Sequence, residues 1–110
     1  MANTFKRKTS KDIGIYASAI GSYTVPAATA TTVIGLTCAN TTSTAITVDV
    51  IHNASGLATY MVKGATVPSG GSLVVIGGDQ KVVLETGDQI LVSSSATASC
   101  DVIMSILEIT

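Results

Sequence analysis

Hydrophobic and polar residues alternate along most of this chain with a period of two. The segment AITVDVIHN shows the pattern most clearly, because Ile46, Val48 and Val50 alternate with Thr47 and Asp49. Successive side chains of a β-strand point to opposite faces of its sheet, so this spacing predicts a strand with one buried face. No segment sustains the three-to-four-residue spacing of an amphipathic helix.

Residues that favour turns divide the chain into short strands. Asn40 opens one polar turn, NASG forms another, and Pro68 with two glycines forms a third. Seven to eight short strands separated by such turns predict an all-β fold, a single antiparallel β-sandwich or jelly-roll-like barrel. The expected strands lie at 22–26, 31–38, 45–53, 57–64, 73–78, 81–87, 89–94 and 99–109.

Two of these strands carry specific predictions about their faces. In 31–38, strict alternation puts one set of side chains on a common face: Thr32, Ile34, Leu36 and Cys38. The last strand is apolar on both faces, with one set comprising Cys100, Val102, Met104 and Ile106, and the other Ile103, Leu107 and Ile109 with Asp101 and Ser105. A half-solvated strand is polar on one side. This strand therefore lies centrally under a loop or packs its second face on a neighbouring chain, and we favour the neighbouring chain.

Composition also favours packing of this strand against a neighbouring chain. Hydrophobic residues make up 46% of the chain and charged residues 12%, compared with about 25% charged in an ordinary soluble domain. Because charge keeps proteins soluble and apart, we expect this chain to bury neutral surface against other subunits. The alternative is a lightly charged monomer coated with Thr and Ser. Cys38 and Cys100 have neither disulfide-framework nor metal spacing and are expected to be reduced, buried thiols.

The charges are unevenly distributed. Residues 1–12 hold four cations against Asp12, for a net charge of +3, whereas residues 13–110 hold two cations against six acids, for a net charge of −4. We therefore predict an extended basic N-terminal arm at 1–12 and a β-sandwich domain at 13–110. The arm either docks on an acidic neighbour or is a solvated tail, and its charges are too few for specific nucleic-acid binding. Its cations are Lys6, Arg7, Lys8 and Lys11.

Neither a signal peptide nor a membrane span is predicted. Asp12 interrupts the segment that follows the basic cluster, so no continuous apolar core of the required length is present. The chain also contains no run of 18 apolar residues.

The stretch VVIGGDQKVVLETGDQI is the place where phosphate or metal chemistry would be sought. A phosphate-binding loop needs a helix after its glycines, but the residues after Gly77 and Gly78 alternate as a strand. We interpret GGDQ and ETGDQ as turns. Asp79, Glu85 and Asp88 are too few for a preorganised calcium site, so neither a metal nor a cofactor is predicted.

No catalytic constellation is present in the sequence. His52 is the only histidine, and no Gly-x-Ser-x-Gly motif occurs. We therefore expect a protein that is not an enzyme. A receptor- or glycan-binding module is an alternative, and its candidate residues are Tyr60 with His52, Asn53 and Ser55.

The runs TVPAATATTVIGLTCANTTSTAITVDV, YMVKGATVPSGGSLVVIGGDQKVVLETGD and SCDVIMSILEIT together resemble a family of short virion structural proteins of tailed phages, common in phages of aquatic bacteria, including cyanophages. The resemblance extends over nearly the whole chain past residue 12, and KGATVPSGGSLVVIGGDQKVVLETGD is its most specific piece. It implies a particle component that is present in many copies, and it implies no catalytic residues.

These observations together predict a non-enzymatic phage virion protein, a capsid decoration or cement subunit. A neck, tail or baseplate subunit is the close variant. We expect a homo-oligomer, a trimer or higher ring, that contacts the major capsid protein or tail and neck proteins, with no membrane partner. It would be assembled in the host bacterial cytoplasm and reside in the virion. The predicted interface residues are Lys6, Arg7, Lys8, Lys11, Ile103, Leu107 and Ile109.

Overall fold

Short strands follow one another along the chain with a single 3-10 turn between them. The computed structural model describes residues 2–77 and 79–110. In order, these described residues form β1 (Asn3–Ile13), β2 (Ser18–Ala19), the 3-10 turn η1 (Ile20–Ser22), β3 (Ala30–Asn40), β4 (Ile46–Ala54), β5 (Leu57–Val67), β6 (Ser72–Ile76), β7 (Val82–Leu84), β8 (Gln89–Ser94) and β9 (Cys100–Ile109).

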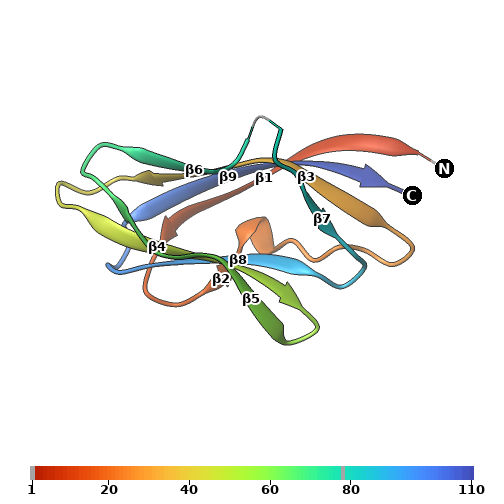
Figure 1. Cartoon of the computed structure of the whole chain (residues 1–110), viewed down its shortest axis with the longest axis horizontal. Helices are drawn as coiled ribbons and strands as arrows, with labels where there is room; N and C mark the ends of the chain where they lie inside the picture. Colours follow the sequence, from red (N-terminus) through yellow and green to blue (C-terminus); the bar gives the residue numbers. More distant parts are fainter. Residues whose placement is uncertain (1, 78) are drawn as a thin grey trace.

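The strands form two antiparallel sheets, drawn as the upper and lower layers of Figure 1. Sheet A has the order β1-β9-β3-β6, with β7 pairing with β3 beside β6, and sheet B has the order β2-β8-β4-β5. Since β6 and β7 both pair with β3, they act as two halves of one interrupted strand. With these halves counted as one strand, the order is that of an eight-stranded jelly roll, which confirms the predicted fold class.

The core lies between the two sheets and is almost entirely aliphatic. The predicted inward residues of β4 (Ile46, Val48 and Val50) are buried. The predicted inward set of β9 is buried as well: Cys100, Val102, Met104 and Ile106. Alternation therefore predicted both faces of these two strands correctly.

The predicted face of β3 was right for Leu36 and Cys38 but wrong for the residues up to the bulge. Val33, Leu36 and Cys38 are buried, whereas Thr32 and Ile34 lie on the other side, partly exposed. The register against β9 shifts between Val33 and Gly35, so β3 contains a bulge with one extra residue. A bulge reverses the alternation beyond it, and the single-period pattern could not reveal this.

The predicted strand at 22–26 was also wrong in type, although its alternation is real. Tyr23 and Val25 are buried and Thr24 between them is exposed. The segment lies outside both ladders and follows η1, where Gly21 has φ +59°. Its backbone is bonded instead to the turn at 85–88, through Val25 and the carbonyl of Asp88.

Three predicted turns are present among the described residues. Ser55 and Gly56 join β4 to β5 with φ values of 52° and 89°, as in a type I′ hairpin turn. In ETGDQ, the amide of Asp88 donates to the Glu85 carbonyl at 3.0 Å, and Gly87 has φ +90°. In GGDQ, the amide of Gln80 donates to the Gly77 carbonyl at 3.2 Å, and Gly78 lies outside the described residues.

The segment predicted as an N-terminal arm is an edge strand in this structure. Residues 3–10 pair in continuous register with β9, from Asn3 opposite Ile109 to Ser10 opposite Val102. In Figure 1 β1 runs along the upper layer, and the two termini lie together at one end. A role of this segment in reaching a neighbouring subunit stays a prediction.

Candidate inter-subunit surface

The outer face of sheet A is formed by side chains that point away from the core. In one row across the sheet, Phe5 of β1 lies beside Leu107 of β9, followed by Thr32 of β3 and Val83 of β7. A second row contains Thr9 of β1, Ile103 of β9, Thr37 of β3 and Val74 of β6, which lie opposite one another in turn. Hereafter, the sheet A outer face means these two rows with Arg7, Ile34, Ser105, Asp101 and Ile109 near them.

Large apolar side chains on this face are strongly exposed. Phe5 is 72% exposed, Val74 and Val83 are each 63% exposed, and Ile103 is 50% exposed. They come from four different strands, so the exposure belongs to the sheet and not to one frayed end. A contiguous exposed apolar surface is typical of a protein contact site.

Few charges interrupt this surface. Among the ladder residues described on this face, the charged ones are Arg7 and Asp101. Two shallow hollows indent it, one beside Ile103 with Thr37 and Ala39, and one between Phe5 and Ile34. The depletion of charge around apolar side chains is characteristic of the core of a protein–protein interface.

The structure divides the predicted interface residues into two groups. Ile103, Leu107 and Ile109 all lie on the sheet A outer face, with Ile103 exposed and the other two partly exposed. Arg7 is exposed opposite Ser105, and Lys11 lines the hollow beside Ile103. The remaining two, Lys6 and Lys8, lie in register opposite Ile106 and Met104 and are engaged within the chain.

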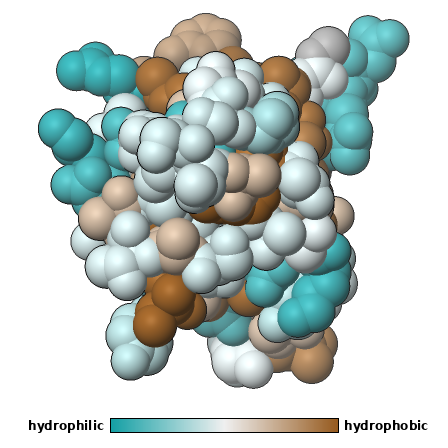
Figure 2. Space-filling model, turned by 90° about the vertical axis from the view of Figure 1, so that its left-hand side faces the viewer, coloured by the Kyte–Doolittle hydropathy of each residue, from teal (hydrophilic) through white to brown (hydrophobic). Residues whose placement is uncertain are grey.

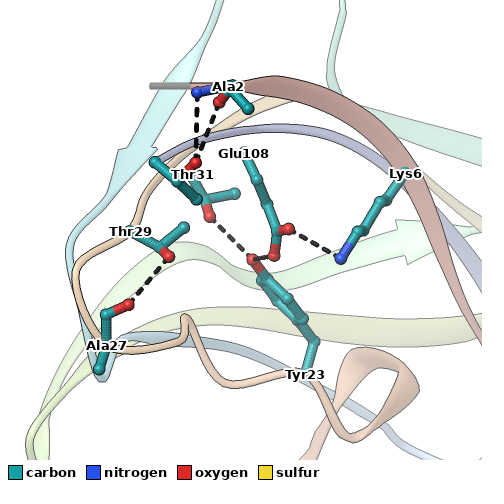
Figure 3. A network of polar contacts seen from close by, with 8 residues as sticks. Ala2, Lys6, Tyr23, Ala27, Thr29, Thr31 and Glu108 are labelled. Carbon is teal, nitrogen blue, oxygen red and sulfur yellow. Dashed lines mark hydrogen bonds and ion pairs between the residues drawn. The ribbon is translucent and has the colours of Figure 1, made fainter.

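Lys6 joins β1 to the body through a polar network with Glu108, Tyr23 and Thr31 (Figure 3), and Lys8 adds a contact with the Tyr23 ring. The Lys6 ammonium lies 2.8 Å from Oε1 of the buried Glu108, and the Tyr23 hydroxyl donates to Oε2 of Glu108 at 2.6 Å. The same hydroxyl lies 2.8 Å from Oγ1 of Thr31, and the Lys8 ammonium lies 5.1 Å from the centre of the Tyr23 ring. Part of the positive charge of residues 1–12 is therefore neutralised inside the chain.

This network shifts the ionisation of both acidic members. The hydrogen bond from Lys6, followed by that from Tyr23, lowers the pKa of Glu108 below its usual range. Burial, together with the hydrogen bond to Glu108, raises the pKa of Tyr23 to about 12. Glu108 is therefore an anion and Tyr23 a neutral donor at neutral pH, as the geometry of the network requires.

The free edge of sheet B, in contrast, is modified in ways that disfavour pairing with another strand. The register of β5 against β4 shifts twice near Val62, and Gly64 there has φ +67°. The amide of Gly64 donates to Oδ1 of Asp49 at 2.7 Å, and Lys63 lies 3.8 Å from the same carboxylate. Bulges and an edge lysine are the features that natural sheets use against edge-to-edge pairing.

One end of the molecule is notably neutral. The β3–β4, β5–β6 and β8–β9 loops gather there, and residues 41–45, 68–71 and 95–99 contain no charged side chain. Figure 2 views this end along the long axis and shows mainly pale surface, with brown patches between and teal at the periphery. The low charge of the composition therefore appears on the surface as well as in the core.

The residues considered for glycan binding do not form one cluster. Tyr60 lies opposite Ile51 in the β4–β5 register, is 49% exposed, and has the Lys63 ammonium 4.7 Å from its ring centre. His52 alternates with Val50 on the inward side and lies 3.2 Å from the buried carboxylate of Asp88. That same carboxylate accepts the Glu85 amide at 3.0 Å, which gives Asp88 and His52 a structural role at the turn.

The cysteines and acidic residues form no ligand set in the described part of the chain. Cys38 and Cys100 are free, buried and adjacent, and their mutual hydrogen bond, followed by burial, raises the pKa of the Cys38 thiol. The described residues contain no group of three or more Cys, His, Asp or Glu side chains placed to hold a metal ion. The described chain also has no helix with the length and apolar character to cross a membrane.

Two solved structures share this architecture. A subunit of Bacillus endospore appendages, described as a novel family of disulfide-linked pili, superposes with a TM-score of 0.57 at 14% identity, covering 98% of this chain and 88% of its own. The virus-like particle of extra small virus (XSV) from the giant freshwater prawn Macrobrachium rosenbergii gives 0.51 at 12% identity, covering 98% and 79%. At these identities the similarity establishes the fold. No family model matches the chain, and no curated protein is similar to it in sequence.

Sequence reasoning missed three members of the apolar surface, namely Phe5, Val74 and Val83. Val74 and Val83 belong to runs of consecutive apolar residues, VV at 74–75 and at 82–83, in which alternation does not tell the inner from the outer residue. A signal for Phe5 was present, because it is the only aromatic residue of the basic segment. Its position beside Leu107 follows from pairing between strands about a hundred residues apart.

Proposed function

We propose that this protein is a non-enzymatic structural subunit of a multi-copy particle. The sheet A outer face is the observation that carries this proposal. It presents exposed apolar side chains from four strands and few charges, whereas the opposite face of the same sheet is the core. Such a surface gains free energy when a neighbour covers it, at about 25 cal/mol per Å² of apolar area.

The particle we propose is a bacteriophage virion, with the protein as a capsid decoration or cement subunit. Support comes from the sequence resemblance to tailed-phage virion proteins, which extends over nearly the whole chain past residue 12. The fold agrees with it, since two of the solved structures that share this architecture come from a pilus and a virus-like particle. A position in the neck, tail or baseplate would use the same surface with a different copy number.

The proposed contact is tested by placing a charge in the middle of the apolar surface. Ile103 is half exposed, so Ile103→Asp should leave the monomer folded while placing a carboxylate inside the contact. We expect self-association to weaken by at least about 2 kcal/mol, because a buried unpaired charge is strongly unfavourable. Sedimentation velocity across a concentration series measures the change, and circular dichroism checks the fold.

Thr66→Asp is the matched control. Thr66 is exposed on the outer surface of sheet B, opposite Thr47, so the substitution adds the same charge on the other face. We expect its association constant to stay within about threefold of the wild type. A wild-type protein that is monomeric at every concentration and absent from purified particles would contradict the proposed function.

A further inference from the structure

β1 contributes unusually little to the core. Its side chains from Asn3 to Ser10 are all exposed or half-buried, and the first buried residue of the strand is Ile13. The neighbouring β9, in contrast, buries every second side chain along its length. Residues 3–10 are therefore held by the backbone ladder to β9, by the ion pair between Lys6 and Glu108, and by polar contacts of Lys8 with the Tyr23 ring and of Ser10 Oγ with the Gly21 amide.

The strand is divided by an irregularity at Lys11 and Asp12. The ladder to β9 is continuous from Asn3 to Ser10 and resumes only at Ile13, opposite Cys100. Asp12 has φ +57°, and its amide donates to Oδ1 of Asp101 at 3.0 Å. The bulge therefore separates residues 3–10 from the rest of the strand.

The residues that follow the irregularity are fixed to the body. The carbonyl of Ile13 accepts the Ser99 amide at 3.0 Å, and the carbonyl of Gly14 accepts the Ser94 amide at 2.8 Å. A change of backbone angles at Lys11 and Asp12 would thus move residues 2–10 without displacing a buried side chain, although it would break the hydrogen bond from the Gly21 amide to Ser10 Oγ. This boundary coincides with the end of the predicted basic arm.

We propose that residues 1–10 exchange between copies of this chain, so that in the assembled particle β1 of one subunit pairs with β9 of its neighbour. The proposal rests on the proposed multi-copy function, which brings a second β9 within reach. An exchanged strand meets a site identical to the one it leaves, including a Glu108 to receive its Lys6. Exchange therefore preserves the ladder and the ion pair, and changes only the connection.

Among strands that could pair with the edge of β9, the charges and register of the site fit β1 of a second copy of this chain. Lys6 and Lys8 both turn toward Glu108 and Tyr23, so an incoming strand must supply cations at the same alternating positions. Edge-to-edge pairing of two β1 strands without exchange is disfavoured, because it would bring together the cations of two basic segments. In dilute solution β1 pairs with β9 of its own chain, because the connection between them gives β1 an effective concentration on the order of millimolar. In a closely packed particle, the β9 strands of neighbouring copies are present at a comparable local concentration and compete for β1.

Cross-linking between two variants, each with one added surface cysteine, tests the exchange. Thr9 and Ile103 lie opposite each other on β1 and β9, so Thr9→Cys and Ile103→Cys are made in separate chains and mixed under assembling conditions. A short bifunctional thiol linker then joins them only across chains. We expect a covalent dimer containing one chain of each kind, identified by mass. Each variant is first treated alone, because native Cys38 and Cys100 are buried and should remain unmodified.

The matched control uses Thr47→Cys mixed with Thr66→Cys. These residues are opposite each other on β4 and β5, which are joined by a tight hairpin turn and remain paired within one chain. We expect no mixed dimer from this pair. A mixed dimer in both experiments would indicate non-specific contact and overturn the proposal.

Removing the ion pair distinguishes exchange from simple proximity of two faces. With Glu108→Gln in both chains, the strand is released more easily, so the rate of mixed-dimer formation should rise severalfold. Asp49→Asn removes an ion pair on sheet B and should leave the rate unchanged. A cross-link whose rate does not respond to Glu108→Gln would mark proximity alone and overturn the exchange.

Sedimentation of the same mixtures separates failure of this inference from failure of the proposed function. Assembly without a mixed Thr9–Ile103 dimer would overturn strand exchange and leave the structural-subunit proposal standing. Absence of assembly would overturn the structural-subunit proposal and the exchange that rests on it.

Discussion

Glu108 is a buried carboxylate whose ionisation is coupled to the stability of the chain. It continues the inward row of β9 after Met104 and Ile106, so its carboxylate is buried where an apolar residue would be usual. Lys6 and Tyr23 compensate for its lost hydration through hydrogen bonds from a basic strand and a loop. The inward position follows from alternation, but its partners were unpredictable, because they lie about a hundred and 85 positions away in the chain.

The lowered pKa of Glu108 predicts how stability depends on pH. A depressed folded-state pKa adds stability that is complete above the unfolded value of about 4.3 and is lost as pH falls through the folded-state value. We expect Glu108→Gln to be less stable than the wild type by about 1–2 kcal/mol at pH 7. This difference should disappear as the pH falls below the usual carboxyl range. Urea unfolding at several pH values measures it.

Asp49→Asn serves as the control, because its partner Lys63 is 70% exposed at 3.8 Å and an asparagine can still accept the Gly64 amide. Exposed pairs contribute little, so its effect at pH 7 should stay within about 0.5 kcal/mol. An equal destabilisation by both variants, or a Glu108→Gln difference that persists in acid, would contradict a structural role for the buried carboxylate.

At the scale of the element, β1 was predicted as an arm and not as a strand, whereas β3 was predicted in position but not in detail. The basic residues of β1 resemble a solvated tail in sequence, yet they pair along β9 over eight consecutive positions. In β3, the pattern located the strand, but the bulge near Ile34 depends on its register with β9. Register is a property of two strands together, and a single segment does not contain it.

Deletion of residues 1–10 tests the independence of the body. Because none of the described residues 2–10 has a buried side chain, we expect the remaining chain to fold cooperatively, with Tm lowered by roughly 5–15 °C through loss of the β1 ladder and the Lys6 ion pair. Self-association should weaken, since Phe5 and Arg7 leave the sheet A outer face. Thermal melts and sedimentation velocity measure the two effects. A chain that no longer melts cooperatively, or that associates as the wild type does, would contradict this view of β1.

At the scale of the whole molecule, the surface has an apolar face on sheet A, a neutral loop end and a modified edge on β5. Each restricts where a neighbour can bind. The bulges and Lys63 disfavour growth at the β5 edge, while the sheet A outer face offers apolar area with few charges. These properties favour contact through the sheet A outer face over growth at the β5 edge, as the proposed function requires.

The sparse charge predicts that assembly responds weakly to salt. Contacts between exposed charges are largely screened at molar ionic strength, whereas apolar contacts persist. We expect the association constant to change by less than about threefold between 0.05 and 0.5 M NaCl. A steep loss of association across this range, measured by sedimentation velocity, would indicate a contact made by the basic residues of β1 in place of the apolar face.

The sequence by itself determined that this protein is all-β, which segments of its second half are strands, and which sides of β4 and β9 face the core. These properties depend on period-two alternation and on turn residues, both of which are local. It also located an apolar set on β9 that the core does not use, in Ile103, Leu107 and Ile109. Only the tertiary structure joined this set to Phe5, Val74 and Val83, placed the basic segment on β9, and paired Lys6 with Glu108. Those features arise when strands distant in the chain come into register, and pairing between distant strands is not encoded in the period of any one of them.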